Sequence, residues 1–196
     1  MLKVGLTGGI GSGKTLAGSV FRALGVPVYL ADDEAKRLMQ SQPELISSVR
    51  KLFGPRAYVD RKLNREYIGG IVFNDHDMLK QLNALVHPAV QADFEQWSKK
   101  NTDKPYVIEE AALLFEAGAA KQMDYTVFVR AGIETRIERV INRDHVSREH
   151  VLSRIRNQMD AAEKEKWADF VIINEIGSMI LPQIVDLHQK LLNLNR

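Results

Sequence analysis

Short apolar runs alternate along the chain with longer segments in which apolar residues have helical spacing. Five of these runs are short enough to be buried strands, and small or polar residues follow most of them: 2–7, 26–30, 105–110, 124–129 and 170–174. Strands that alternate with helices are typical of a parallel sheet covered by helices. The pattern therefore predicts an α/β fold with a five-stranded parallel sheet, whose ligands lie beyond the carboxyl ends of the strands.

Two long segments interrupt this alternation. Residues 31–103 separate the second and third expected strands and are too long for a simple crossover, so we expect a helical insertion there. Residues 136–167 carry many arginines and helix formers without a strand, which suits a mobile lid over a site. No repeat or linker divides the chain. We therefore predict one domain over 1–196, with core strands in 1–30, 104–135 and 168–196.

Composition and charge narrow the classes of function. The 27 basic and 25 acidic residues nearly cancel, so the overall charge does not call for nucleic acid or an anionic membrane. The absence of cysteine excludes disulfides, thiolate nucleophiles and cysteine-ligated zinc, and the histidines lack the H-E-x-x-H spacing of a zinc site. No signal peptide is recognisable, and no apolar run approaches the about 18 residues of a membrane span. We expect a cytoplasmic protein without a nucleic-acid or membrane partner, and its oligomeric state stays open.

Residues 8–15 satisfy the pattern G-x-x-x-x-G-K-S/T between an expected strand and an expected helix. In such a loop, glycines let backbone N–H groups converge on phosphate oxygens, and the following helix N-terminus favours negative charge. Lys14 would reach the β- and γ-phosphates, and the Thr15 hydroxyl would bind Mg²⁺. The predicted cradle for ATP consists of Gly8, Gly9, Ile10, Gly11, Ser12, Gly13, Lys14, Thr15 and Leu16. The cradle alone does not decide whether the nucleotide is a phosphoryl donor, a switch ligand or a mechanical fuel.

Carboxylates follow two of the expected strands. The second strand runs into Asp32 and Asp33, either of which can act as a general base near the phosphates or cap the next helix. The spacing leaves both interpretations open. Glu109 and Glu110 are adjacent on the third strand, so their side chains point to opposite faces. At most one of them faces the cradle, where it would bind Mg²⁺ through water.

Three arginines follow the fourth expected strand. Arg136, Arg139 and Arg143 are spaced so that they share one helical face. Such a basic face is often only solvated, and it can also cover phosphates. Trp97 and Trp167 lie where an amphipathic helix can bury them, so we expect both to serve in packing.

The chain resembles the dephospho-CoA kinase family over nearly its whole length. The resemblance is carried by residues 6–15, by L-N-A-L-V-H-P at 82–88, by A-L-L-F-E at 112–116 where the family has P-L-L-F-E, by R-I-x-x-Q at 154–158, and by residues 168–174. It implies a P-loop three-layer fold and the transfer of a phosphoryl group from ATP, with Mg²⁺, to the ribose 3′-hydroxyl of dephospho-CoA, the final step of coenzyme A biosynthesis. Residues 31–103 would then bind the acceptor, and residues 136–167 would form the lid.

The resemblance also implies roles for single residues. Asp32 falls on the second aspartate of the family's D-x-D element and would be the base, whereas Leu30 replaces the first aspartate. The other implied site residues are Arg65 and His87 as acceptor contacts, Leu113, Leu114 and Phe115 as an apolar wall for the acceptor, Arg139 and Arg143 over the phosphates, and Asn174 near the adenine.

Read without the family, several of these residues have structural explanations. His87 precedes Pro88 and would stand at a helix bend, since the residue before proline avoids the helix. Residues 113–115 would be ordinary core, and Asn174 would cap the last helix. Two other functions stay open: a P-loop kinase of another nucleoside or nucleotide, and a nucleotide-dependent switch without a small acceptor.

Overall fold

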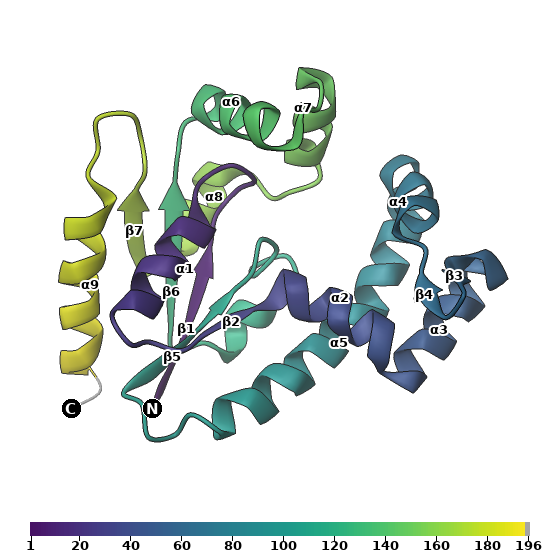
Figure 1. The fold of residues 1–196 in the computed structure, drawn as a ribbon. Helices are drawn as coiled ribbons and strands as arrows, with labels where there is room; N and C mark the ends of the chain where they lie inside the picture. The colour runs from purple at the N-terminus through teal and green to yellow at the C-terminus, as the bar shows by residue number, and fades with distance from the viewer. Residues whose placement is uncertain (195–196) are drawn as a thin grey trace. The chain divides into compact units, whose positions relative to one another are not determined.

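The computed structural model describes residues 1–194, and the chain divides into two compact units. The first unit contains Met1–Leu30 and the chain from Ser98 onward, and the second contains Ala31–Trp97. Figure 1 shows the ribbon of both units. Within residues 1–194, no helix combines the length and the apolar character needed to cross a membrane.

The first unit is built on a five-stranded sheet in the order β2-β5-β1-β6-β7, in which all neighbouring strands are parallel. The strands are β1 (Leu2–Thr7), β2 (Val28–Leu30), β5 (Tyr106–Glu110), β6 (Tyr125–Arg130) and β7 (Phe170–Ile173). The predicted α/β class and the five parallel strands are confirmed. β2 is shorter than the predicted 26–30 because Pro27 has no N–H for the ladder.

Helices complete the first unit. They are α1 (Lys14–Ala23), α6 (Ile133–Asp144), α7 (Arg148–Arg156), α8 (Ala161–Trp167) and α9 (Ile180–Leu194), with a short 3-10 helix η2 (Ala119–Gln122). Ala17 and Phe21 of α1 are fully buried, and α9 buries Ile184, Leu187 and Leu191, which recur every three or four residues. These side chains join the strand residues in one apolar core, so α1 and α9 cover the sheet with their apolar stripes.

The strands of this sheet all end at the same edge. β1 leads into the phosphate loop, β5 ends at Glu110, β6 at Arg130, and β7 is followed by Asn174. Because parallel strands place their carboxyl ends together, residues from four distant parts of the chain meet around residues 8–15.

The second unit is mainly helical. Its elements are α2 (Ala31–Ser41), α3 (Pro43–Phe53), η1 (Pro55–Ala57), β3 (Tyr58–Val59), β4 (Lys62–Leu63), α4 (Arg65–Asn74) and α5 (His76–Lys99). It lies within the segment 31–103 that the sequence predicts to be a helical insertion. The antiparallel hairpin of β3 and β4 is not predicted, because its turn residues Asp60 and Arg61 have positive φ angles of 49° and 63° but are not the usual Asn-Gly pair.

Polar contacts fix the helices of the second unit to one another. Arg37 of α2 binds Asp93 of α5 at 2.7 Å, and the Tyr58 hydroxyl donates to the Met39 carbonyl at 2.6 Å. α5 continues through Pro88, so His87 lies inside a helix although it precedes a proline, and the helix bend expected there stays a prediction.

Candidate active site

Residues 8–15 form a loop between β1 and α1. At two positions of this loop the backbone conformation favours glycine. Gly11 and Gly13 have φ angles of 78° and 91°, in the left-handed region that side chains disfavour. A Cβ on Gly13 would collide with the side-chain amide of Asn174, and one on Gly9 would collide with the guanidinium of Arg136. The loop therefore lies in direct contact with α6 and with the residue that follows β7.

Donors from distant parts of the chain hold the carbonyl groups of this loop. Arg136 Nε donates to the Ile10 carbonyl at 2.9 Å, and Asn174 Nδ2 donates to the Ser12 carbonyl at 2.7 Å. Arg139 Nη2 binds the Asn174 carbonyl at 3.1 Å, and its Nη1 lies 3.5 Å from the Ser12 carbonyl. These contacts fix the orientation of the peptide groups in the loop.

The anchored carbonyls determine where the N–H groups point. In a trans peptide the C=O and the following N–H lie on opposite sides, so anchoring the Ile10 and Ser12 carbonyls turns the N–H groups of Gly11 and Gly13 away from the anchors. The first N–H groups of α1 have no acceptor within the helix, and no side chain caps this helix. The result is a set of converging donors at the positive end of a helix, which is a binding site for phosphate groups.

Glu110 stands beside this cradle at the end of β5. The Thr15 hydroxyl donates to Glu110 Oε1 at 2.9 Å, and Lys14 Nζ lies 3.9 Å from the same oxygen. The Glu110 side chain is only 6% exposed. A hydroxyl and a carboxylate oxygen are ligands that suit Mg²⁺, so this pair fits the ion that accompanies nucleotide phosphates. Of the adjacent glutamates 109 and 110, it is Glu110 that faces the cradle.

The three arginines of α6 have different environments. Arg136 is buried and Arg139 is half-buried, and both contact the phosphate loop, whereas Arg143 pairs with its neighbour Asp144 at 2.7 Å. This pairing raises the pKa of Arg143 and lowers the pKa of Asp144. The shared helical face predicted that all three arginines could cover phosphates. Spacing could not show that Arg136 anchors the loop and that Arg143 has an acidic partner.

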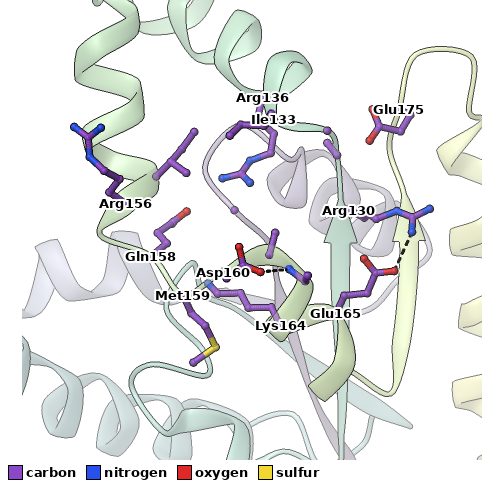
Figure 2. Close-up of a pocket in the computed structure, with 16 residues that line it drawn as sticks. Arg130, Ile133, Arg136, Arg156, Gln158, Met159, Asp160, Lys164, Glu165 and Glu175 are labelled. Atoms are coloured by element: carbon purple, nitrogen blue, oxygen red, sulfur yellow. Dashed lines mark hydrogen bonds and ion pairs between the residues drawn. The ribbon is translucent and has the colours of Figure 1, made fainter.

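A cavity of about 610 Å³ adjoins the loop at Gly9. Figure 2 shows Arg136 from α6, Gln158 from the segment after α7, and Lys164 from α8 on different sides of this cavity. Burial lowers the pKa of Lys164, and the positive charges of Arg136 and Lys14 lower it further, although Glu116 opposes the shift. Burial also lowers the pKa of Arg136. Basic and acidic side chains both line this cavity, and the sequence did not indicate Lys164 as part of it.

The segment after β5 contains the residues expected to form an apolar wall. Leu114 is fully buried, and its side chain fills the space that a Cβ on Gly5 of β1 would need, which fits the core interpretation. Leu113 and Phe115 are half-buried. The rings of Phe115 and Trp167 pack edge to face with centroids 5.8 Å apart, but Trp167 is 57% exposed, so the prediction that its helix buries it is wrong.

The remaining predicted residues belong to the second unit. Asp32 is exposed in the first turn of α2, and its carboxylate has no hydrogen-bond or ion-pair partner among residues 1–194, whereas Asp33 pairs with Lys36 at 2.7 Å. Arg65 is the exposed first residue of α4, and His87 is half-buried in α5.

Asp32 follows Leu30, the last residue of β2, by two positions along the chain. Asn174 Nδ2 holds the Ser12 carbonyl, and Asn174 does not cap the last helix, which begins at Ile180; its expected place near an adenine stays a prediction.

Comparisons with known proteins agree with this fold. A sequence profile described as Dephospho-CoA kinase matches residues 2–179. A dephospho-CoA kinase of Bacteroides fragilis is 37% identical over 186 residues, which cover 95% of this chain and 91% of the relative. A crystal structure of a Thermus thermophilus protein is similar with a TM-score of 0.82 and 35% identity, covering 98% of this chain and 96% of that chain. The dephospho-CoA kinase from Campylobacter jejuni shares the fold, with a TM-score of 0.71 at 24% identity over 99% and 98% of the two chains.

Proposed function

The chain belongs to the dephospho-CoA kinase family, and we propose that it transfers the γ-phosphoryl group of ATP to the ribose 3′-hydroxyl of dephospho-CoA. In this proposal residues 8–15 bind the phosphates and Asp32 is the general base. The observation that carries the proposal is the phosphate loop itself. Its carbonyls are held from outside by Arg136, Arg139 and Asn174, so the N–H groups of Gly11 and Gly13 are oriented for phosphate before any ligand binds.

On the donor side, the N–H groups at the start of α1 bind the phosphates of ATP, and Lys14 contributes a positive charge at the β- and γ-phosphates. We place Mg²⁺ at the Thr15 hydroxyl with Glu110 beside it, because these two oxygen ligands already adjoin each other. Bound there, Mg²⁺ would neutralise part of the negative charge on the phosphates during transfer. Arg139 lies on the loop and is the α6 arginine best placed to act on the phosphates.

On the acceptor side, Asp32 takes the proton of the 3′-hydroxyl. The 3′-oxygen then forms a bond to the γ-phosphorus as the bond from that phosphorus to the β,γ-bridging oxygen breaks, and ADP leaves. An exposed carboxylate without a partner suits this role better than Asp33, which is bound to Lys36. Arg65, His87, Leu113 and Phe115 remain candidate contacts of the acceptor.

The location and the partners follow from composition. We place the enzyme in the cytoplasm, where ATP is available, since the chain lacks cysteine. We assign no nucleic acid as a partner, because its 27 basic and 25 acidic residues nearly cancel.

An acceptor screen tests the function. The purified chain is incubated with ATP and Mg²⁺ and, separately, with dephospho-CoA, nucleosides and nucleoside monophosphates, while ADP release and product mass are measured. We expect acceptor-dependent ADP release and a phosphorylated product with dephospho-CoA alone. A phosphorylated product from a nucleoside or nucleotide instead would identify another small-molecule kinase. A rate of ATP hydrolysis that stays the same with every acceptor would favour a nucleotide-dependent switch.

A further inference from the structure

Gln158 contacts the phosphate loop from a distant part of the chain. Its Oε1 accepts a hydrogen bond of 3.0 Å from the Ile10 N–H, and the carbonyl of Ile10 accepts one of 2.9 Å from Arg136. Both polar groups of Ile10 are thereby held by side chains, one from α6 and one from the segment between α7 and α8. Figure 2 shows Gln158 and Arg136 near each other at the cavity beside Gly9.

The next residue of the same segment contacts a different loop. The Met159 N–H donates to Glu116 Oε1 at 2.9 Å, and Glu116 lies in the segment that follows β5. Consecutive residues therefore connect the loop that binds the donor to the segment expected to line the acceptor site. Met159 and Glu116 are 43 positions apart, and Ile10 and Gln158 are 148 apart, so this connection depends entirely on the fold.

A buried lysine fixes this connection in place. Lys164 Nζ binds Glu116 Oε1 at 2.6 Å and the Ala112 carbonyl at 3.0 Å, and its side chain is 1% exposed. Charged hydrogen bonds that are shielded from water are stronger and more rigid than exposed pairs. The Glu116 carboxylate is thus held at the position where it accepts from Met159, and the backbone before it presents Gln158 to Ile10.

We propose that Gln158 is a positioning residue for phosphoryl transfer. It fixes the peptide groups at Ile10 and so holds the phosphate loop at a fixed position relative to the segment after β5. This inference rests on the proposed kinase function. Transfer requires the attacking oxygen and the γ-phosphorus to be aligned closely, and small displacements reduce the rate strongly. ATP binding uses many other donors of the loop and of α1, so it depends less on this single contact.

The steady-state constants of Gln158 variants test the proposal. Gln158→Met preserves length but removes the amide acceptor, so we expect kcat to fall about tenfold while the KM for ATP changes less than about threefold. Gln158→Glu keeps an oxygen that can accept from Ile10 but adds a negative charge near the phosphates, so we expect it to retain more of kcat and to raise the KM for ATP. Asn157→Ala, one residue earlier, is the matched control and should behave as the wild type.

A second readout reports the contact itself. Amide hydrogen exchange of Ile10, followed by NMR in the protein without nucleotide, should accelerate in Gln158→Met but stay near the wild-type rate in Gln158→Glu and Asn157→Ala. Gln158 is half-buried, so the melting temperature should change little. If Gln158→Met does not fold, Gln158→Asn withdraws the acceptor by one methylene group and carries the same expectations.

The outcomes separate the two proposals. An active wild type together with a folded Gln158→Met variant of unchanged kcat, or of unchanged Ile10 exchange, would overturn the positioning role alone. A wild type that makes no phosphorylated product from dephospho-CoA would overturn the function and the inference together. A loss of kcat in which Gln158→Glu loses as much as Gln158→Met would show that the acceptor oxygen is not what matters, which also contradicts the proposal.

Discussion

The Thr15 hydroxyl donates a hydrogen bond of 2.9 Å to Oε1 of Glu110, so the first turn of α1 is linked directly to the carboxyl end of β5. Lys14 Nζ lies 3.9 Å from the same oxygen. One carboxylate oxygen thus contacts both side chains to which we assign the phosphates and the metal ion, Lys14 and Thr15. In the proposed function, Glu110 is therefore the acidic residue whose removal should change the response to Mg²⁺.

Glu110→Gln is expected to weaken the response to Mg²⁺. Glutamine still offers an oxygen to Thr15 but loses the negative charge that attracts a divalent cation, so the Mg²⁺ concentration for half-maximal rate should rise about tenfold. The rate is measured against Mg²⁺ concentration at saturating ATP and acceptor. Glu163→Gln, which removes an exposed carboxylate of α8, is the control. An unchanged Mg²⁺ dependence in Glu110→Gln would exclude Glu110 from the metal site.

Gly13→Ala should damage the loop more than its backbone strain alone explains. Gly13 and Gly25 have similar φ angles of 91° and 84°, but a Cβ on Gly13 meets Asn174 whereas one on Gly25 has nothing within 4 Å. Gly25→Ala therefore measures the strain alone, about 1–2 kcal/mol of unfolding free energy, with activity retained. Gly13→Ala should lose more stability and most of its ATP affinity. Denaturant unfolding and calorimetric ATP titration compare the two, and equal behaviour would contradict the steric explanation.

Lys164→Met is expected to destabilise the fold by about 2 kcal/mol, since it removes the charged donor of the Ala112 carbonyl and of the Glu116 carboxylate, whose side chain is 20% exposed. The double variant Lys164→Met with Glu116→Gln removes the unpaired charge and should recover part of the loss. Denaturant unfolding of the wild type, both single variants and the double variant gives the coupling energy. Independent effects of the two substitutions would mean that the ion pair contributes nothing beyond its separate side chains.

Lys14→Ala should sharply reduce turnover, because it removes a positive charge from the phosphates during transfer. Since Lys14 Nζ lies 3.9 Å from Glu110, too far for a hydrogen bond, we expect little change in melting temperature. The rate of product formation from dephospho-CoA is the measurement, and Lys36→Ala on α2 serves as a lysine control. Turnover near that of the wild type would remove Lys14 from the catalytic groups.

The sequence predicted the parts of this site that depend on neighbours along the chain. The apolar run before Gly8 and the helix that begins at Lys14 are local features, and the glycine pattern between them is typical of a phosphate-binding loop. The parallel sheet follows from the alternation of strands and helices, and it places Glu110 beside β1 because β5 is the neighbour of β1.

The contacts that complete the site are not local. Arg136 meets Ile10 across 126 positions and Gln158 meets it across 148, so no spacing rule connects them. Nothing in the sequence distinguishes Lys164 from the exposed charged residues of its polar helix. Its burial depends on the Glu116 carboxylate, which comes from another segment. The hairpin turn at Asp60 and Arg61 was missed for a different reason, since Arg61 stands with a positive φ angle at the second turn position, where such turns usually have glycine.

Asp32→Asn should reduce kcat by roughly a hundredfold or more, the usual contribution of a general base, while ATP affinity changes only a few-fold. Asparagine has the same shape but cannot take the proton of the 3′-hydroxyl. Asp33→Asn is the matched control, because it loses only an exposed pair with Lys36, and such surface pairs contribute about 0–1 kcal/mol. Product formation from dephospho-CoA gives kcat, and calorimetry gives the ATP affinity. Should Asp33→Asn lose more kcat than Asp32→Asn, the base lies one residue further along α2, and the exposed, unpaired carboxylate of Asp32 would then serve only the dipole at the start of that helix.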